Sequence, residues 1–352
     1  MREQRPEHLA SGCLLVGLPA GDWTPRVGQR IEALDPAGVI LFGRNLVSAE
    51  RTREMLGRIA ERLTRPPLLA IDQEGGRVSR LERWIGPTVA ARSLAALDES
   101  AARGFGEATG RALRWLGLNL DFAPVVDLSA VDATNGIGDR SFGTDPRLVT
   151  RMARAFLGGL QGAGVAGCLK HFPGLGHTAI DSHDALPTVR RPLERLREED
   201  LLPYRELGDL PASVMVGHGH YPAFDGETPL PATLSPAIVG GELRGRLGFG
   251  GLVVSDDMEM GAVAGRDGEG AAAVAAVRAG CDLLLYCSDL DRAETAARAL
   301  AAAARADDEL GDRLLRASER VGRFAERWHG VTSPPELAEW RGCVAAFEAF
   351  RA

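Results

Sequence analysis

The segment from Lys170 to Pro187 contains the densest group of side chains that could carry out chemistry. Its sequence, KHFPGLGHTAIDSHDALP, holds one lysine, three histidines and two aspartates among glycines and prolines. Five of the seven histidines of the chain lie between residues 171 and 220, namely His171, His177, His183, His218 and His220. Such a set could bind a metal, exchange protons in a catalytic reaction, or simply solvate a surface loop.

Eight short apolar runs, each bounded by turn residues, are the elements that would have to position these side chains. They lie near Leu15, Ile40, Leu69, Phe122, Gly167, Met215, Val253 and Leu284. Continuous rather than alternating hydrophobicity over such short runs is typical of strands covered on both faces, and hence of a parallel sheet. Helix-like segments with charges on one face alternate with the runs. The pattern predicts an α/β fold, a (β/α)8 TIM-type barrel in a single domain.

We expect the barrel to span residues 1–330 and to be followed by a C-terminal tail at 331–352. The alternative fold is an open doubly wound sheet. No G-x-G-x-x-G follows the first apolar run, where a dinucleotide-binding sheet of that kind would need it.

The composition and charge of the chain limit the kinds of partner that it can bind. The chain has 352 residues, of which 45% are hydrophobic, and a formal net charge of -7 with both signs mixed along it. It therefore lacks the basic stripe that nucleic acid requires, and no apolar run approaches membrane-spanning length. The five cysteines are odd in number and mostly lie inside apolar runs, as reduced thiols do. We expect a cytoplasmic monomer that binds neither nucleic acid nor a membrane.

In a barrel, the reacting groups come from the C-terminal ends of the strands and from the loops that follow them. The ionisable residues after the third to seventh runs would therefore face one rim. They are Asp72, Arg77, Arg80, Asp127, Arg140, Lys170, His171, His218, His220, Asp256 and Asp257. For Asp257, Asp184, His177 and His220 we favour a structural role, in which the side chain satisfies a cap or a backbone group.

A metal site is one interpretation of this rim. The side chains that could converge on a cation are His171, His177, His183, His218 and Asp256. Their spacing matches neither H-x-H nor H-E-x-x-H, and the arginines and the lysine at the same rim would repel a cation. We therefore expect no metal.

Glycosyl transfer is the interpretation that these residues favour. A retaining glycosidase needs a carboxylate nucleophile and a proton donor about 5 Å away on the leaving-group side. Asp256, at the end of a buried strand, suits the first role. His183 suits the second, because imidazole titrates near neutral pH and Asp181 can orient its ring. Sugar hydroxyls would then be bound by Lys170, Arg80, Arg140 and Asp72.

Four motifs in this order resemble those of bacterial β-N-acetylglucosaminidases of glycoside hydrolase family 3, the peptidoglycan-recycling type. The Lys170–Pro187 segment is similar to the family loop K-H-F-P-G-x-G-x-x-x-x-D-S-H. The other three motifs are AIDQEGGRVSRL, GDRSFG and GLVVSDDMEMGAV. The resemblance spans roughly Leu14 to Leu285.

The resemblance implies roles for named residues. Asp256 would be the nucleophile, His183 the acid/base and Asp181 its dyad partner, in a retaining mechanism. The sugar would be bound by Asp72, Arg80, Arg140, Lys170 and His171. The implied enzyme is exo-acting, removes terminal N-acetylglucosamine from peptidoglycan fragments or related glycans, and uses no cofactor.

Two positions depart from the family pattern, and other functions stay open. Leu175 stands where the loop often has histidine, and His177 where it is commonly acidic or small. The alternatives on the same fold are a β-glucosidase or a glycoside phosphorylase, since a histidine acid/base leaves room for phosphate as acceptor. Two further alternatives are a metal-dependent barrel hydrolase and a sugar-binding barrel without enzymatic activity.

Overall fold

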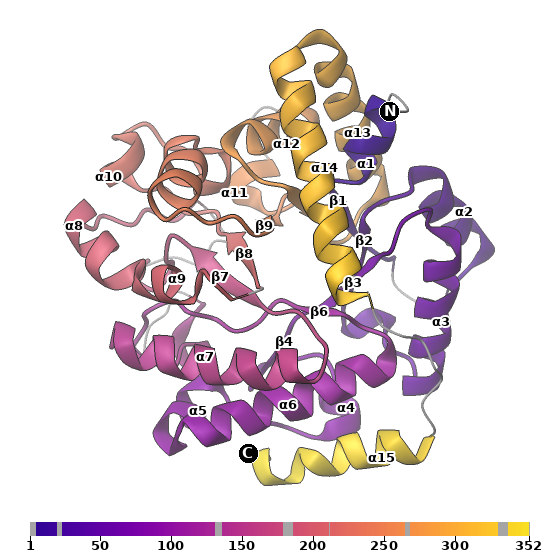
Figure 1. Cartoon of the computed structure of the whole chain (residues 1–352), viewed down its shortest axis with the longest axis vertical. Helices are drawn as coiled ribbons and strands as arrows, with labels where there is room; N and C mark the ends of the chain where they lie inside the picture. The colour runs from indigo at the N-terminus through magenta and orange to yellow at the C-terminus, as the bar shows by residue number, and fades with distance from the viewer. Residues whose placement is uncertain are drawn as a thin grey trace.

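The computed structural model describes residues 5–19, 23–130, 136–178, 186–210, 212–264, 268–329 and 337–351. Eight parallel strands form its central sheet (Figure 1). In their order around the sheet they are β6 (Leu120–Asp121), β3 (Leu68–Ile71), β2 (Gly38–Leu41), β1 (Leu14–Gly17), β10 (Leu283–Tyr286), β9 (Val253–Asp257), β8 (Ser213–Val216) and β7 (Cys168–Phe172). Each of the eight predicted runs contributes one of these strands.

Contacts between β6 and β7 close the sheet into a barrel. Leu120 pairs with Ala166, and Val125 pairs with Lys170, as isolated parallel bridges. Strand β6 is only two residues long, but backbone hydrogen bonds between the two segments continue beyond it, from the Cys168 N–H to the Ala123 carbonyl and from the Val126 N–H to the Lys170 carbonyl. The predicted (β/α)8 barrel is confirmed.

Helices surround the sheet and cover its outer face (Figure 1). They are α1 (Pro6–Ser11), α2 (Pro25–Leu34), α3 (Ala49–Arg62), α4 (Glu82–Ile85), α5 (Ala91–Leu97), α6 (Glu99–Leu116), α7 (Pro146–Gly162), α8 (Leu193–Arg195), α9 (Leu202–Leu207), α10 (Pro222–Asp225), α11 (Gly261–Ala264), α12 (Glu269–Ala279), α13 (Leu290–Ala306), α14 (Asp308–Trp328) and α15 (Leu337–Ala346). Two π-helical segments lie at Leu196–Asp200 and Ala237–Arg246. Within the described ranges, no helix is both long enough and apolar enough to cross a membrane.

Except for the two-residue β6, each strand contributes to two buried cores. In β1, Leu15 packs inside the barrel with Ile40 and Phe122. Its neighbours Leu14 and Val16 pack in the layer between the sheet and the helices. Because both faces of the strands are buried, strands such as β1, β2, β3 and β10 are apolar at consecutive positions, whereas β7 and β9 also carry polar residues of the candidate site.

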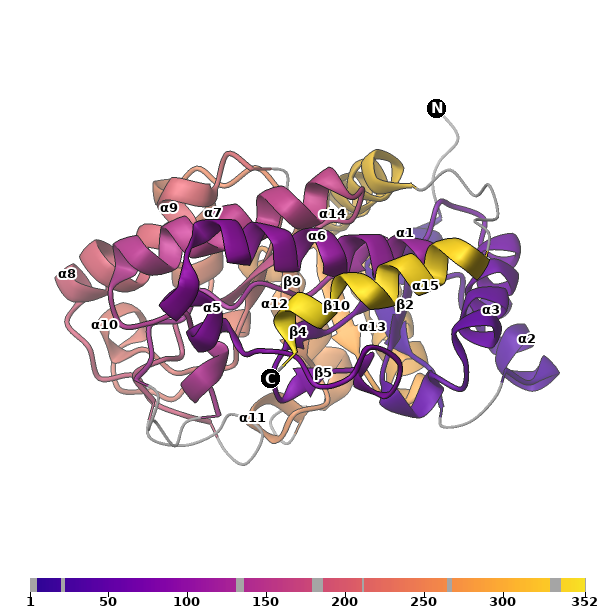
Figure 2. The same ribbon diagram turned by 90° about the horizontal axis from the view of Figure 1, so that it is seen from below.

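Helix α14 closes one end of the barrel and leaves the other end to the loops. Its residues Val321, Phe324 and Ala325 belong to the inner core. Figure 2 shows α14 on the side opposite α11 and the short hairpin of β4 (Gln73–Gly75) and β5 (Val78–Ser79). The hairpin and α11 follow the C-terminal ends of β3 and β9, so the open rim is the one where the candidate residues lie.

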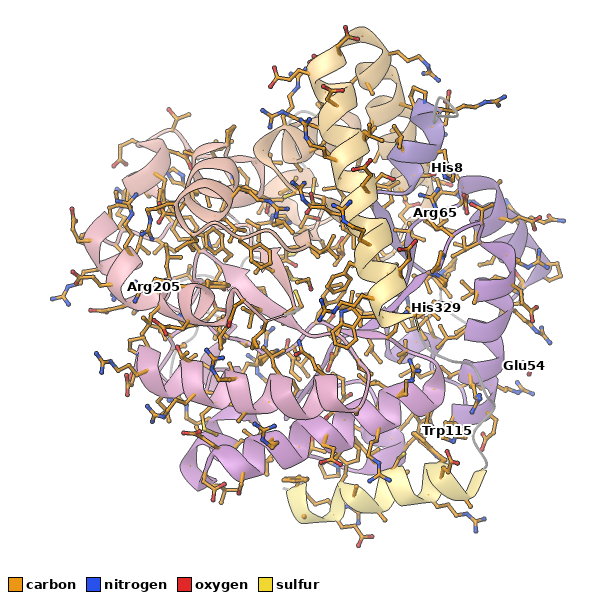
Figure 3. All side chains as sticks on the ribbon, viewed as in Figure 1. His8, Glu54, Arg65, Trp115, Arg205 and His329 are labelled. Atoms are coloured by element: carbon orange, nitrogen blue, oxygen red, sulfur yellow. The ribbon has the colours of Figure 1, made fainter. Side chains whose placement is uncertain are left out.

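The C-terminal helix α15 packs against α6 on the outside of the barrel. Trp340 stacks on Trp115 with 4.9 Å between ring centroids, and meets Trp84 edge-on at 5.9 Å. Figure 3 shows Trp115 next to α15. Phe347, just beyond α15, packs edge-on against Phe105 at 5.9 Å. The described part of the predicted tail is thus held by aromatic contacts, while the domain boundary at residue 330 stays a prediction.

Helices α6 and α7 lie so close together that Gly106 has no room for a side chain. A Cβ at this position would be 2.2 Å from the Phe156 carbonyl oxygen, a backbone atom of α7. We expect Gly106→Ala to destabilise the protein by about 1–3 kcal/mol, because the two helices must separate. The control is Gly57→Ala in α3, where nothing lies within 4 Å of the added Cβ. Thermal melts should show a lowered Tm for the first variant alone; equal melting temperatures would contradict this close packing.

Candidate functional site

Six of the eight predicted site residues line one cavity of about 240 Å³ at the open rim of the barrel. They are Asp72, Arg80, Arg140, Lys170, His171 and Asp256. They follow or end the strands β3, β5, β7 and β9, except for Arg140, which lies in the long loop after β6. The other two, Asp181 and His183, lie outside the described residues.

The floor of the cavity is apolar, and one wall holds the half-buried side chain of Arg80. Ile40, Met215 and Leu285 come from the inner core of the barrel. The Arg80 guanidinium lies over the Phe42 ring, 5.7 Å from its centroid. Its Nε is buried and has no hydrogen-bond partner among the described residues. A buried donor without a partner costs free energy, so this N–H favours a ligand that can accept a hydrogen bond.

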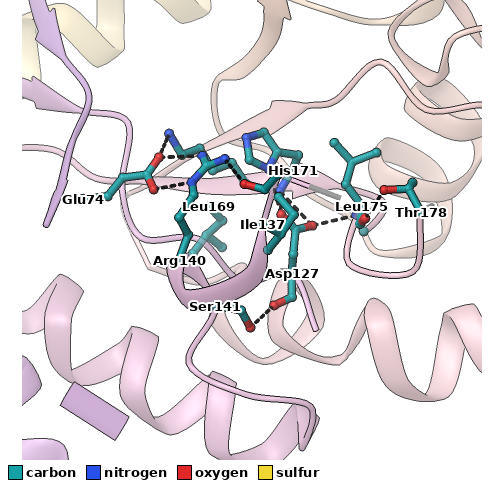
Figure 4. A network of polar contacts seen from close by, with 12 residues as sticks. Glu74, Asp127, Ile137, Arg140, Ser141, Leu169, His171, Leu175 and Thr178 are labelled. Atoms are coloured by element: carbon teal, nitrogen blue, oxygen red, sulfur yellow. Dashed lines mark hydrogen bonds and ion pairs between the residues drawn. The ribbon is translucent and has the colours of Figure 1, made fainter. Parts of the chain in front are cut away.

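Two anions and two cations form a network along one wall of the cavity, and Figure 4 shows the part of it in which Arg140 contacts Glu74. Lys170 Nζ lies 2.7 Å from Asp72 Oδ1 and 2.6 Å from Glu74 Oε1. Arg140 donates to both oxygens of Glu74, from Nε and from Nη2, at 2.7 Å each. Glu74 therefore connects the end of β7 to the loop after β6, and its bidentate bond fixes the plane of the Arg140 guanidinium.

The network keeps its members charged although they are buried. Burial disfavours the ionised form of Glu74, but the charges of Arg140 and Lys170 outweigh it and hold the pKa of Glu74 far below its ordinary value. Burial likewise opposes the charge on Lys170, and Asp72 and Glu74 outweigh it, so the pKa of Lys170 is raised. Both side chains are at most 5% exposed. The wall is thus a set of fixed charges at neutral pH.

Glu74→Gln should weaken substrate binding. The neutral amide leaves Lys170 and Arg140 with one carboxylate fewer and can accept only through a single oxygen, so the two cations lose their fixed positions. We expect kcat/KM to fall about 10- to 100-fold, mostly through KM. Steady-state kinetics on an aryl glycoside measure this. The matched control is Glu99→Gln, which alters an exposed ion pair with Arg151 and should change neither constant; an unchanged KM in Glu74→Gln would contradict the role of the network.

Asp127 organises the start of the Lys170–Pro187 loop. Its Oδ2 lies 2.7 Å from His171 Nδ1, and its Oδ1 accepts from the Leu175 backbone N–H at 2.7 Å. The His171 N–H lies 3.2 Å from both oxygens. Because a carboxylate can only accept, His171 carries a proton on Nδ1. Asp127 is fully buried, which suits a role in positioning His171 rather than in contacting a ligand.

Sequence reasoning gave no role to Glu74 or Asp127. Asp127 carries the signal shared by the other site residues, since it ends an apolar run. Glu74 lies inside the DQEGG motif, two residues after Asp72, but its partner Arg140 is 66 positions away. Only the fold brings that pair together.

The two aspartates at the end of β9 have different environments. Asp256 Oδ1 accepts from the Asp257 N–H at 2.9 Å. Burial disfavours the Asp256 carboxylate, but the charges of His218 and His171 outweigh it and lower its pKa below the ordinary value. Asp257 Oδ1 instead accepts from the N–H groups of Glu259 and Cys287, and burial raises the pKa of Asp257 to about 6. Of these two aspartates, Asp256 is the one whose ionised form is favoured, whereas Asp257 fixes the following turn.

The described histidines near the rim each contact a different partner. His171 bonds to Asp127, and His177 Nε2 lies 3.4 Å from Asp200 Oδ1. His218 lies within hydrogen-bonding distance of Thr233 and of the Asp257 carbonyl, and His220 accepts from the Leu230 N–H. Across the described ranges, no three side chains of His, Cys, Asp or Glu are placed to hold a metal ion.

A larger cavity, of about 560 Å³, lies beneath α15, away from these residues. Arg53, Arg111 and Arg114 line it together with the C-terminal ends of α6, α7 and α14. Helix C-termini carry a partial negative charge, which the positive charges of these arginines complement. Among the described lining residues, Glu339 is the one carboxylate. A retaining glycosidase needs a proton donor in addition to a carboxylate nucleophile. The smaller cavity is therefore the candidate active site.

Comparison with known proteins gives consistent matches. The model of the glycosyl hydrolase family 3 N terminal domain matches residues 25–323. A beta-hexosaminidase of Alkalilimnicola ehrlichii is 42% identical over 277 residues, which cover 75% of this chain and 74% of that protein. The solved structure of a glycoside hydrolase family 3 beta-N-acetylglucosaminidase from Paenibacillus sp. str. FPU-7 matches with a TM-score of 0.84 and 35% identity, over 96% of this chain and 67% of that one. A family 3 member from Mycobacterium smegmatis matches with a TM-score of 0.80 and 36% identity, over 91% and 96% of the two chains.

Proposed function

Because this chain belongs to glycosyl hydrolase family 3, we propose that it is an exo-acting, retaining β-N-acetylglucosaminidase. The family makes it a glycosidase that acts on carbohydrate, as its four motifs predicted. The names of its relatives, beta-hexosaminidase and beta-N-acetylglucosaminidase, support the choice of N-acetylglucosamine over glucose. The small volume of the cavity, about 240 Å³, favours a single terminal sugar over the interior of a long glycan.

One observation carries this proposal: an ionised carboxylate and a rigid polar wall face the same small cavity. Asp256 supplies the carboxylate, and its lowered pKa keeps it nucleophilic at neutral pH. The wall supplies fixed donors and acceptors for sugar hydroxyls. The residues that bind the sugar are Asp72, Arg80, Arg140, Lys170 and His171.

The reaction proceeds in two steps. Asp256 attacks the anomeric carbon while His183 protonates the departing oxygen, which gives a covalent glycosyl-aspartate. His183 then takes a proton from water, which attacks the anomeric carbon and releases the sugar. Asp181 orients the His183 ring and stabilises its charged form. Using histidine as the acid avoids a second anion close to the nucleophile.

The substrates, the location and the assembly are finer parts of the same proposal. Terminal N-acetylglucosamine is removed from peptidoglycan fragments or related glycans by a cytoplasmic monomer. The five cysteines are free and buried, which is consistent with a reducing compartment.

Hydrolysis of an aryl N-acetyl-β-glucosaminide, compared with the matching β-glucoside, tests the proposal. We expect the N-acetyl substrate to be cleaved far faster and the first product to be the β-anomer. A faster rate on the glucoside would indicate a β-glucosidase instead. No hydrolysis of either compound, with tight glycan binding, would indicate a sugar-binding barrel.

Added phosphate and chelators separate the remaining alternatives. Formation of a sugar 1-phosphate in preference to the free sugar would identify a glycoside phosphorylase. Loss of activity with a chelator, restored by zinc, would identify a metal-dependent hydrolase. We expect the free sugar as the main product and full activity after chelation.

A further inference from the structure

We propose that His218 is a positioning residue for the nucleophile: it holds the main chain that carries Asp256 and places a positive charge beside that carboxylate. The inference rests on the proposed role of Asp256. His218 itself is fully buried and lies two residues after β8, the strand that pairs with β9 through Val216 and Ser255. The side chain thus extends from the strand next to the one that ends in the nucleophile.

One ring nitrogen of His218 holds the turn after Asp256. Nε2 lies 2.9 Å from the Asp257 carbonyl oxygen. A carbonyl can only accept, so Nε2 carries a hydrogen and donates it. The N–H of the same residue, Asp257, donates to Asp256 Oδ1 at 2.9 Å. His218 therefore restrains the residue that orients the Asp256 carboxylate.

The other ring nitrogen of His218, Nδ1, contacts the Thr233 hydroxyl. The single hydrogen of that hydroxyl can be donated to either of two nearby carbonyl groups. Nδ1 lies 2.7 Å from Thr233 Oγ1, and that oxygen lies 3.2 Å from the carbonyl oxygens of Val216 and Gly217. When the hydroxyl hydrogen points to these carbonyls, Thr233 Oγ1 accepts from Nδ1. Both nitrogens then carry hydrogens, which is the imidazolium form that this proposal assigns to His218.

The surroundings of Asp256 favour this charged form. A buried imidazolium needs a nearby anion, and the Asp256 carboxylate supplies it. The positive groups that act on Asp256 among the described residues include His218 from the end of β8 and Lys170 and His171 from β7, while the Asp257 carboxyl repels it. Of these, Lys170 bonds to Asp72 and Glu74, and His171 to Asp127. His218 is the one whose ring also bonds to the backbone next to Asp256.

Two substitutions separate the hydrogen bond from the charge. His218→Gln can keep an N–H donor near the Asp257 carbonyl but is neutral, whereas His218→Leu lacks both. We expect His218→Leu to lower kcat about 100-fold with little change in KM, and His218→Gln to lower it less than 10-fold. Both should move the acid limb of kcat/KM to higher pH by about one unit, because Asp256 loses a neighbouring charge and its pKa rises. The control is His220→Gln, a buried histidine two residues away that bonds to Leu230 and should change neither kcat nor the acid limb.

A direct titration keeps this test independent of the enzymatic activity. Carbon-13 NMR of carboxyl-labelled aspartate, with Asp256→Asn to assign the signal, reports the Asp256 pKa in each folded variant. An upward shift of about one unit in both His218 variants supports the role. An unchanged Asp256 pKa, or His218→Leu with wild-type kcat, would overturn it. If the Asp256 pKa rises in both His218 variants but wild type hydrolyses no glycoside, the proposed function fails while the effect of His218 on the Asp256 carboxylate stands.

Discussion

Asp256→Asn should abolish turnover while leaving the fold intact. Asparagine has nearly the same shape and can still accept from the Asp257 N–H through its side-chain oxygen, but it cannot form the glycosyl ester. We expect kcat to fall by a factor on the order of 10⁴ or more, as for other enzymes that lose their nucleophile. Rates on an aryl N-acetyl-β-glucosaminide measure the loss, and a thermal melt checks the fold.

The adjacent aspartate provides a matched control. Asp257 holds the backbone N–H groups of Glu259 and Cys287. Asp257→Asn should therefore affect stability more than chemistry, with a loss of kcat that is small compared with that of Asp256→Asn. If the two variants had exchanged effects, with Asp257 essential and Asp256 dispensable, the assignment of the nucleophile would be wrong.

His183→Ala should show a loss that depends on the leaving group. Substrates with poor leaving groups, such as a disaccharide, need a proton donor and should be cleaved about 10²- to 10⁴-fold more slowly. An activated dinitrophenyl glycoside needs no proton and should form the glycosyl-enzyme at nearly the wild-type rate. Because water activation is also lost, the covalent intermediate should then accumulate, and azide, which needs no general base, should restore turnover as a glycosyl azide. Burst kinetics on the activated substrate detect both effects.

Two further variants test whether His183 acts through its dyad partner. Asp181→Asn should produce the same leaving-group dependence with a smaller loss. His177→Ala is the control in the same loop: His177 lies 3.4 Å from Asp200, and its removal should give no leaving-group dependence. Equal losses on good and poor leaving groups in His183→Ala would contradict the acid/base assignment.

The barrel could be predicted from the sequence because its strands are buried on both faces. Short uninterrupted apolar runs bounded by turn residues, such as the one near Leu69, are typical of such strands, and polar residues just after them must lie at the rim. This logic predicted a common rim for Asp72, Lys170 and Asp256, and the three residues do line one cavity, while their roles stay predictions. This reasoning needs only the local sequence, because the C-terminal ends of all strands of a (β/α)8 barrel lie at the same rim.

Contacts between distant segments could not be predicted in the same way. The link from Glu74 to Arg140 joins a hairpin after β3 to the loop after β6, and neither motif specifies the other. The contact between Trp340 and Trp115 could not be predicted either. It holds α15 against α6, although the two residues are far apart in the sequence. The roles of Asp181 and His183 stay predictions, since both lie outside the described residues.

Trapping of the glycosyl-enzyme tests the identity of the nucleophile most directly. A 5-fluoro N-acetylglucosaminyl donor with a reactive leaving group should label the enzyme, because fluorine destabilises the oxocarbenium-like transition state and slows hydrolysis of the intermediate. Mass spectrometry after proteolysis should find one sugar on Asp256, and none in Asp256→Asn. A sugar on a different carboxylate, or turnover of the donor without any covalent adduct, would contradict a retaining mechanism at Asp256.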